Sequence, residues 1–129
     1  MTSRRREEGT SAVELVLYMP LLMIAIIFTV QFALVFLGNQ AASASAREAA
    51  RVGRVTDDPA LARAKGESYA ANLGQGVLEQ VTVTVERVGD EEMRATVSGE
   101  APHLLPFFAP PRVSEEVQGP IERFVQDGP

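Results

Sequence analysis

The chain has 129 residues with a net charge of -5, which leaves room for one modest folded domain beside a single long apolar run. It has one lysine, Lys65, and the acidic balance argues against a nucleic-acid-binding surface, which needs clustered lysine and arginine, so we expect no nucleic-acid partner. The absence of cysteine excludes disulfides, thiolate nucleophiles and zinc-thiolate sites.

The first element is an apolar segment. Residues 15–37 carry no charge, and the uncharged stretch continues to Ala46. A helix of about 20 apolar residues spans a bilayer, so we predict a transmembrane helix over residues 10–38. The arginines before it, Arg4 to Arg6, predict a cytoplasmic N-terminus and an extracytoplasmic domain over residues 39–129, although Arg47, Arg51 and Arg54 weaken that bias.

Two residues of this segment are unusual for a plain anchor. Pro20 removes a helical donor, so it either kinks the helix or is a tolerated membrane proline. Glu14 is either a boundary charge in the headgroup layer or a deeper carboxylate that needs a cation. That cation would come from another chain or from a terminus.

The run from Gly9 to Glu14, between a charged leader and the apolar helix, resembles the processing site of class III prepilins. The resemblance implies that residues 1–9 are a leader and that a prepilin peptidase cuts between Gly9 and Thr10. Glu14 then becomes the fifth residue of the mature chain. In pilins this carboxylate is thought to meet the N-terminal amine of a neighbouring subunit, which implies that Glu14 is the assembly carboxylate.

Two further motifs resemble TadE-like proteins of the Tad (Flp, type IVb) pilus system. The first is Ala12-Val13-Glu14-Leu15 with Pro20, and the second is Ala46-Arg47-Glu48-Ala49-Ala50-Arg51, where Ala49 replaces the family's glycine. Major pilins of this class are shorter and carry Glu-Tyr where this chain has Glu14-Leu15. The resemblance therefore implies a minor pilin (pseudopilin) or assembly factor.

The same resemblance implies a location in the cell inner or plasma membrane, with a single pass, and a place in the pilus for some family members. The implied partners are the lipid bilayer, the prepilin peptidase, other Tad pilins and the pilus assembly platform. Adhesion is the usual purpose of such pili.

Beyond the membrane, residues 39–55 are predicted to continue the helix, and Thr56 to Pro59 to end it and cap a second helix over residues 59–73. Small residues recur along one stripe of the first helix, at Ala42, Ala46, Ala49 and Gly53. This stripe permits a close subunit contact, and it is equally compatible with an exposed alanine-rich helix bearing a solvated basic face.

The period then changes to two, which predicts strands over residues 77–88, 93–98 and 112–118, with a turn at Gly89 to Glu92 and an end segment holding Ile121 and Phe124. The expected fold class is α+β and pilin-like, with a small antiparallel sheet of about three strands. A proline-rich loop, residues 102–111, contains five apolar residues, namely Leu104, Leu105, Phe107, Phe108 and Ala109. We expect them to pack back onto the domain, and the alternative is a docking patch for a partner.

Little in the sequence indicates catalysis. His103 is the single histidine, and the acidic turn Asp90 to Glu92 lacks the spacing of a calcium loop. We therefore predict a non-enzyme with no catalytic residues, no metal site and no cofactor.

Two other functions stay open. Ordinary signal peptidase could cut at Ala42-Ser43-Ala44 or Ala44-Ser45-Ala46 and release a secreted fragment that begins near Ser45 or Arg47, although the apolar run is long for a signal peptide. The chain could also be an uncleaved single-pass anchor that carries an extracytoplasmic binding module.

Overall fold

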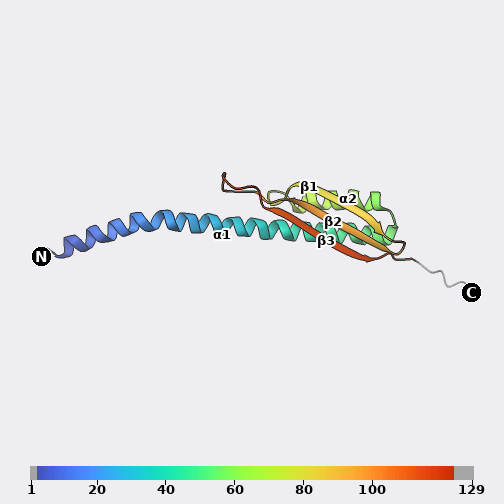
Figure 1. Ribbon diagram of the computed structural model, residues 1–129, viewed down its shortest axis with the longest axis horizontal. Coiled ribbons are helices and arrows are strands. Elements are labelled where there is room, and N and C mark those ends of the chain that lie inside the picture. The colour runs from blue at the N-terminus through green and yellow to red at the C-terminus, as the bar shows by residue number, and fades with distance from the viewer. Residues whose placement is uncertain (1–2, 124–129) are drawn as a thin grey trace, which may run out of the picture. The chain divides into compact units, whose positions relative to one another are not determined.

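The computed structural model describes residues 3–123, with side chains from Gly9 onward. Two compact units divide the chain, Met1–Ala33 and Leu34–Pro129, and helix α1 (Ser3–Thr56) contributes to both (Figure 1). The side chains of Arg4 to Arg6 and the predicted apolar residue Phe124 lie outside the described part.

The first unit is the N-terminal part of α1, which runs through Pro20 without a break in the helix. Most of its large apolar side chains are exposed, as at Phe32, which is 74% exposed. The hydroxyl of Thr29 donates to the carbonyl of Ala25 at 2.8 Å, so this polar group is satisfied within the helix. Among the described residues, α1 is the one helix long and apolar enough to cross a membrane.

The second unit adds helix α2 (Pro59–Leu73) and strands β1 (Glu79–Val88), β2 (Glu92–Glu100) and β3 (Arg112–Pro120) to the rest of α1. The strands form an antiparallel sheet in the order β1-β2-β3. This arrangement confirms the predicted α+β fold class with a long N-terminal helix, a second helix and three strands. The strand ends differ from the predicted ranges by no more than two residues, which is the usual uncertainty of element boundaries.

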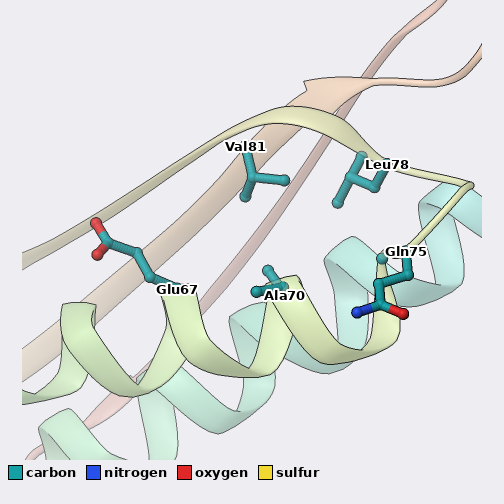
Figure 2. A pocket seen from close by; sticks show the side chains of 7 residues that line it. Glu67, Ala70, Gln75, Leu78 and Val81 are labelled. Atoms are coloured by element: carbon teal, nitrogen blue, oxygen red, sulfur yellow. The ribbon is translucent and has the colours of Figure 1, made fainter.

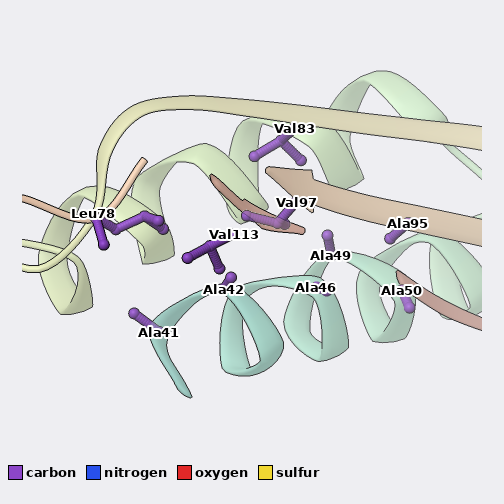
Figure 3. Close-up of a cluster of buried hydrophobic side chains, with 11 residues drawn as sticks. Ala41, Ala42, Ala46, Ala49, Ala50, Leu78, Val83, Ala95, Val97 and Val113 are labelled. Atoms are coloured by element: carbon purple, nitrogen blue, oxygen red, sulfur yellow. The ribbon is translucent and has the colours of Figure 1, made fainter. Parts of the chain in front are cut away.

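The sheet has one buried and one exposed face. On β2, residues from Met93 to Gly99 alternate between buried and half-buried positions, and Val83 of β1 pairs with Val97. Alternating side chains point to opposite faces of a strand, so the valines share one face. The helices α1 and α2 supply the other layer over that face (Figure 3).

The core between these layers consists mainly of alanine and valine. From α1 it takes Ala41, Ala42, Ala46, Ala49 and Ala50, and from the sheet and its flanking loops it takes Leu78, Val83, Ala95, Val97, Ala101 and Val113. The small-residue stripe of α1 therefore forms the chain's own core. The stripe is therefore neither a subunit contact nor an exposed surface, because the sheet and α2 cover it, whereas Arg47 and Arg51 of the predicted basic face are exposed as expected.

Two helical glycines lie where segments of the second unit approach each other closely. A Cβ at Gly66 of α2 would lie 2.9 Å from the Cβ of Ala49 and 3.0 Å from Cγ1 of Val83. A Cβ at Gly38 of α1 would lie 2.8 Å from the carbonyl oxygen of Val77. These distances are shorter than ordinary contacts, so only glycine fits the observed spacing.

The break between the helices follows the predicted capping pattern. Asp57 takes a positive φ of 53° at the end of α1. Asp58 is the N-cap of α2, and its Oδ1 accepts from the amides of Ala60 and Leu61 at 3.0 and 3.1 Å. Arg87 of β1 pairs with the Asp57 carboxylate at 2.8 Å, which ties this break to the edge of the sheet.

The proline-rich loop corrects one expectation. Leu104, Phe107 and Phe108 are 46%, 94% and 64% exposed, so they do not pack back onto the domain. The loop contains four prolines, which restrict its backbone.

Candidate processing and assembly site

The proposed scissile bond lies near the start of α1. Gly9 and Thr10 are helical and exposed, and a Cβ at Gly9 would meet nothing within 4 Å. Peptidases generally require an unwound substrate, and glycine weakens a helix by about 1 kcal/mol relative to alanine. The residue before the predicted cut is therefore both accessible and a weak point of the helix.

Glu14 follows Thr10 by four residues, which places the two on the same side of the helix. Its side chain is exposed, and the ion pairs found among the described residues all lie in the second unit. A carboxylate at this position is accessible to a cation from outside the helix.

The motif from Ala46 to Arg51 divides between two faces of α1. Ala46, Ala49 and Ala50 are fully buried in the core. On the exposed side, Arg51 donates to both carboxylate oxygens of Glu48, at 2.8 and 2.9 Å. These hydrogen bonds and the positive charge of Arg51 lower the pKa of Glu48 below its ordinary value of 4.5. The motif thus has a structural explanation in this chain, with alanines for packing and charges for the solvated face.

An open depression of about 450 Å³ lies between α2 and β1 (Figure 2). Ala70, Leu78 and Val81 form its apolar walls, and the polar side chains Glu67 and Gln75 stand at opposite ends. These two polar side chains do not converge within the depression (Figure 2).

The other residues considered for chemistry lie apart. His103 is exposed in the proline-rich loop, and Asp90 and Glu91 are exposed in the turn after β1. Within the described range, no group of three potential ligands among His, Cys, Asp and Glu is close enough to hold a metal ion.

The sequence missed two features that the tertiary structure reveals. The exposed apolar patch at Leu104, Phe107 and Phe108 was expected to be covered. The close approaches at Gly38 and Gly66 were also not anticipated, and a glycine inside a helical pattern was their only available signal.

The comparisons with known proteins agree with the motifs. A family model described as TadE-like protein matches residues 9–51, a third of the chain. No curated protein and no solved structure matches the chain. The matched segment starts at Gly9, contains Glu14 and Pro20, and ends with the Ala46 to Arg51 motif, so over residues 9–51 the chain has the TadE-like sequence that its motifs indicated.

Proposed function

We propose that the chain is a TadE-like pseudopilin, a minor pilin or assembly factor of a Tad-type pilus or secretion system. The observation that carries the proposal is the family match over residues 9–51, because it joins the proposed processing site, the apolar helix and the first part of the core helix in one ordered segment. The role is structural, and we propose no catalytic activity.

The anchor is the apolar part of α1. Its leucine, isoleucine and phenylalanine side chains are exposed in the isolated chain, and lipid is the solvent that favours them. The arginines at positions 4–6 favour a cytoplasmic N-terminus, so the second unit is proposed to lie outside the cytoplasm.

The processing step is proposed to be cleavage of the Gly9–Thr10 bond by a prepilin peptidase. Hydrolysis creates an ammonium group at Thr10, and the carboxylate of Glu14 is exposed and available to the equivalent ammonium of a neighbouring subunit. A charge pair in or near hydrocarbon is screened less than one in water, so an unpaired Glu14 carboxylate there would favour a neighbouring ammonium as its partner.

The signal-peptidase alternative fits the structure less well. Its two candidate sites lie within α1, where Ala42, Ser45 and Ala46 are buried. A cut after Ala44 would detach Ala41 and Ala42 from the core that covers the sheet. The uncleaved single-pass anchor that carries an extracytoplasmic binding module remains the second candidate, and its N-terminus would be Met1 in place of Thr10.

The test is the N-terminal residue and intact mass of the membrane-extracted protein, expressed with and without the cognate prepilin peptidase. The pseudopilin proposal expects a start at Thr10 that depends on the peptidase. A start near Ser45 or Arg47 would establish secretion instead, and an intact Met1 end in the presence of active peptidase would leave a plain anchor.

Variants separate the two proposed roles. Gly9→Leu places a bulky side chain before the scissile bond and should leave the precursor uncut, whereas the control Ser11→Ala should be processed normally. Glu14→Gln should still be processed but should fail to co-purify with the other pilins, because it lacks the charge that pairs with an ammonium. Normal co-purification of Glu14→Gln would remove the assembly role of this carboxylate.

A further inference from the structure

The proline-rich loop between β2 and β3 presents the two most exposed large apolar side chains of the second unit, Phe107 and Phe108, and a third exposed one, Leu104. Phe107 is 94% exposed, and Phe108 and Leu104 are 64% and 46% exposed. Residues 101–111 contain no aspartate, glutamate, lysine or arginine. An uncharged patch of this kind on a small domain usually marks a surface that is covered in the working protein.

The base of this loop lies beside the end of the apolar run of α1. Gly38 is the residue directly after that run, and it belongs to the same unit as the loop. A Cβ at Gly38 would lie 3.8 Å from the Cβ of Ala101 and 3.5 Å from Cγ2 of Val113, the residues that flank the loop. Both ends of the loop are therefore at the level where α1 becomes buried in the domain.

The direction of α1 within this unit decides where lipid would lie. From Gly38 the helix runs toward Gly53, which contacts Met93 near the β1–β2 turn at the other end of the sheet. The apolar residues Leu34 to Leu37 precede Gly38, so the membrane boundary falls at the end of the sheet that carries the loop. Figure 1 shows the loop continuing beyond the sheet at that end.

The two ends of the sheet differ in chemistry as well as in position. The turn between β1 and β2 carries Asp90, Glu91 and Glu92, whereas the loop between β2 and β3 carries the two phenylalanines. Carboxylates favour water, and aromatic and leucine side chains favour the interfacial region of a bilayer. The domain is thus polarised along α1, with its apolar end toward the predicted membrane.

The backbone of the loop also suits a bilayer surface. Four of its residues, Pro102, Pro106, Pro110 and Pro111, have no N–H group. Of the other amides, that of Ala101 donates to the carbonyl of Pro111 at 2.9 Å and that of Phe108 to Leu105 at 3.3 Å. Fewer unpaired donors lower the cost of placing irregular backbone near hydrocarbon. Arg112, exposed where the loop joins β3, is placed to meet lipid phosphate.

From these observations we infer that the loop is a second membrane contact, in which Leu104, Phe107 and Phe108 enter the interfacial layer of the outer leaflet beside α1. The occupant of the patch is lipid. With the helix and the loop both held, the domain has two attachment points, which restrict its tilt relative to the bilayer surface. This inference rests on the proposed membrane anchor and does not depend on cleavage at Gly9.

The test uses the full chain in vesicles of phosphatidylcholine and phosphatidylglycerol. Because the chain has no cysteine, the variants Phe107→Cys, Glu91→Cys and Leu22→Cys each carry one environment-sensitive fluorophore. Lipids with a nitroxide at a shallow or a deep acyl position report the depth of each label. The emission of the fluorophore at position 107 should shift to the blue, and shallow nitroxides should quench it strongly. The fluorophore at position 91 should be quenched by neither nitroxide, and the fluorophore at position 22 should be quenched by deep nitroxides.

Other outcomes overturn the inference in distinguishable ways. A Phe107 label that behaves like the Glu91 label, beside a deeply quenched Leu22 label, keeps the anchor and removes the loop contact. An unquenched Leu22 label removes the anchor and the loop contact together. A Phe107 label that becomes shielded only when other pilin subunits are added identifies a protein-docking surface in place of a lipid contact.

A second comparison excludes insertion driven by the fluorophore itself. The label is placed at Leu104→Cys, with and without the further changes Phe107→Ser and Phe108→Ser. Loss of shallow quenching in the serine background is expected, and unchanged quenching would contradict the inference. Since these side chains are exposed, amide hydrogen exchange of the sheet should stay the same and show that the domain is folded.

Discussion

Between Leu15 and Leu37, α1 carries leucine, isoleucine, methionine and phenylalanine side chains that stay exposed, whereas its buried residues between Ala41 and Gly53 are chiefly alanines. One continuous helix therefore uses large apolar side chains where the chain itself provides no cover and small ones where the sheet and α2 approach. Close packing of layers depends on small residues, while lipid accommodates side chains of any size.

The largest expected effect comes from the same substitution in the two regions. Met93→Ala removes a fully buried side chain from β2 and should lower the free energy of unfolding of the domain by about 2–5 kcal/mol. Met23→Ala removes an exposed methionine from the first unit and should change it by less than about 0.5 kcal/mol. Hydrogen exchange of the sheet amides in micelles measures both.

A similar loss of unfolding free energy in Met93→Ala and Met23→Ala would contradict the contrast between the exposed first unit and the buried core. It would mean that the first unit contributes to the stability of the domain, which the exposure of its side chains does not predict.

The second effect tests the close approach of the helices. Gly66→Leu forces α2 away from Ala49 and Val83. Replacing glycine stabilises the helix by roughly 1 kcal/mol, but the overpacking outweighs this gain, so we expect the free energy of unfolding to fall by a net amount of about 1–3 kcal/mol. The control Ala64→Leu, exposed on the same helix, should be close to neutral. Thermal unfolding of the two variants, detected by their susceptibility to proteolysis, would distinguish them. A Gly66→Leu variant as stable as the wild type would show that the layers are less tightly packed than the structure indicates.

A third, smaller effect concerns the N-terminal cap of α2 at the break between the two helices. Asp58→Ala removes the acceptor for the amides of Ala60 and Leu61 and should cost about 1 kcal/mol. The matched change Asp90→Ala should cost less, because the hydrogen bond that Asp90 receives from Arg123 uses its backbone oxygen. Exchange rates of the α2 amides are the measurement, and equal rates in the two variants would remove the capping role.

The smallest effect is the dependence on pH of the Glu48–Arg51 pair. Since folding lowers the pKa of Glu48, the pair stabilises the domain above the ordinary value of 4.5, and this contribution is lost as the pH falls through the lowered pKa. Unfolding midpoints of the wild type and Glu48→Gln should therefore converge in acid. In an Arg51→Ala background their difference should be reduced at every pH, and a persistent difference would assign the effect to another charge.

The order and type of the elements could be predicted because each has a strong local signal. The charge-free run, the Asp58-Pro59 cap and the alternation of Val81, Val83 and Val85 all act over a few neighbouring residues. The candidate site at Gly9 and Glu14 was also visible locally, as a short motif at a defined distance from an apolar helix. Whether the alanine stripe and the apolar side chains of the proline-rich loop are buried depends on contacts distant in sequence, and both predictions were wrong.

By itself, the sequence determined that the chain combines one membrane-length helix with a small α+β domain and that its first part is TadE-like. Periodicity, charge and capping are properties of adjacent residues, so they can be read without coordinates. Only the tertiary structure decided that the small-residue stripe is internal core and that Leu104, Phe107 and Phe108 are left uncovered. Whether an apolar side chain is buried depends on which distant segment reaches it, and that is settled when α1, α2 and the sheet pack together.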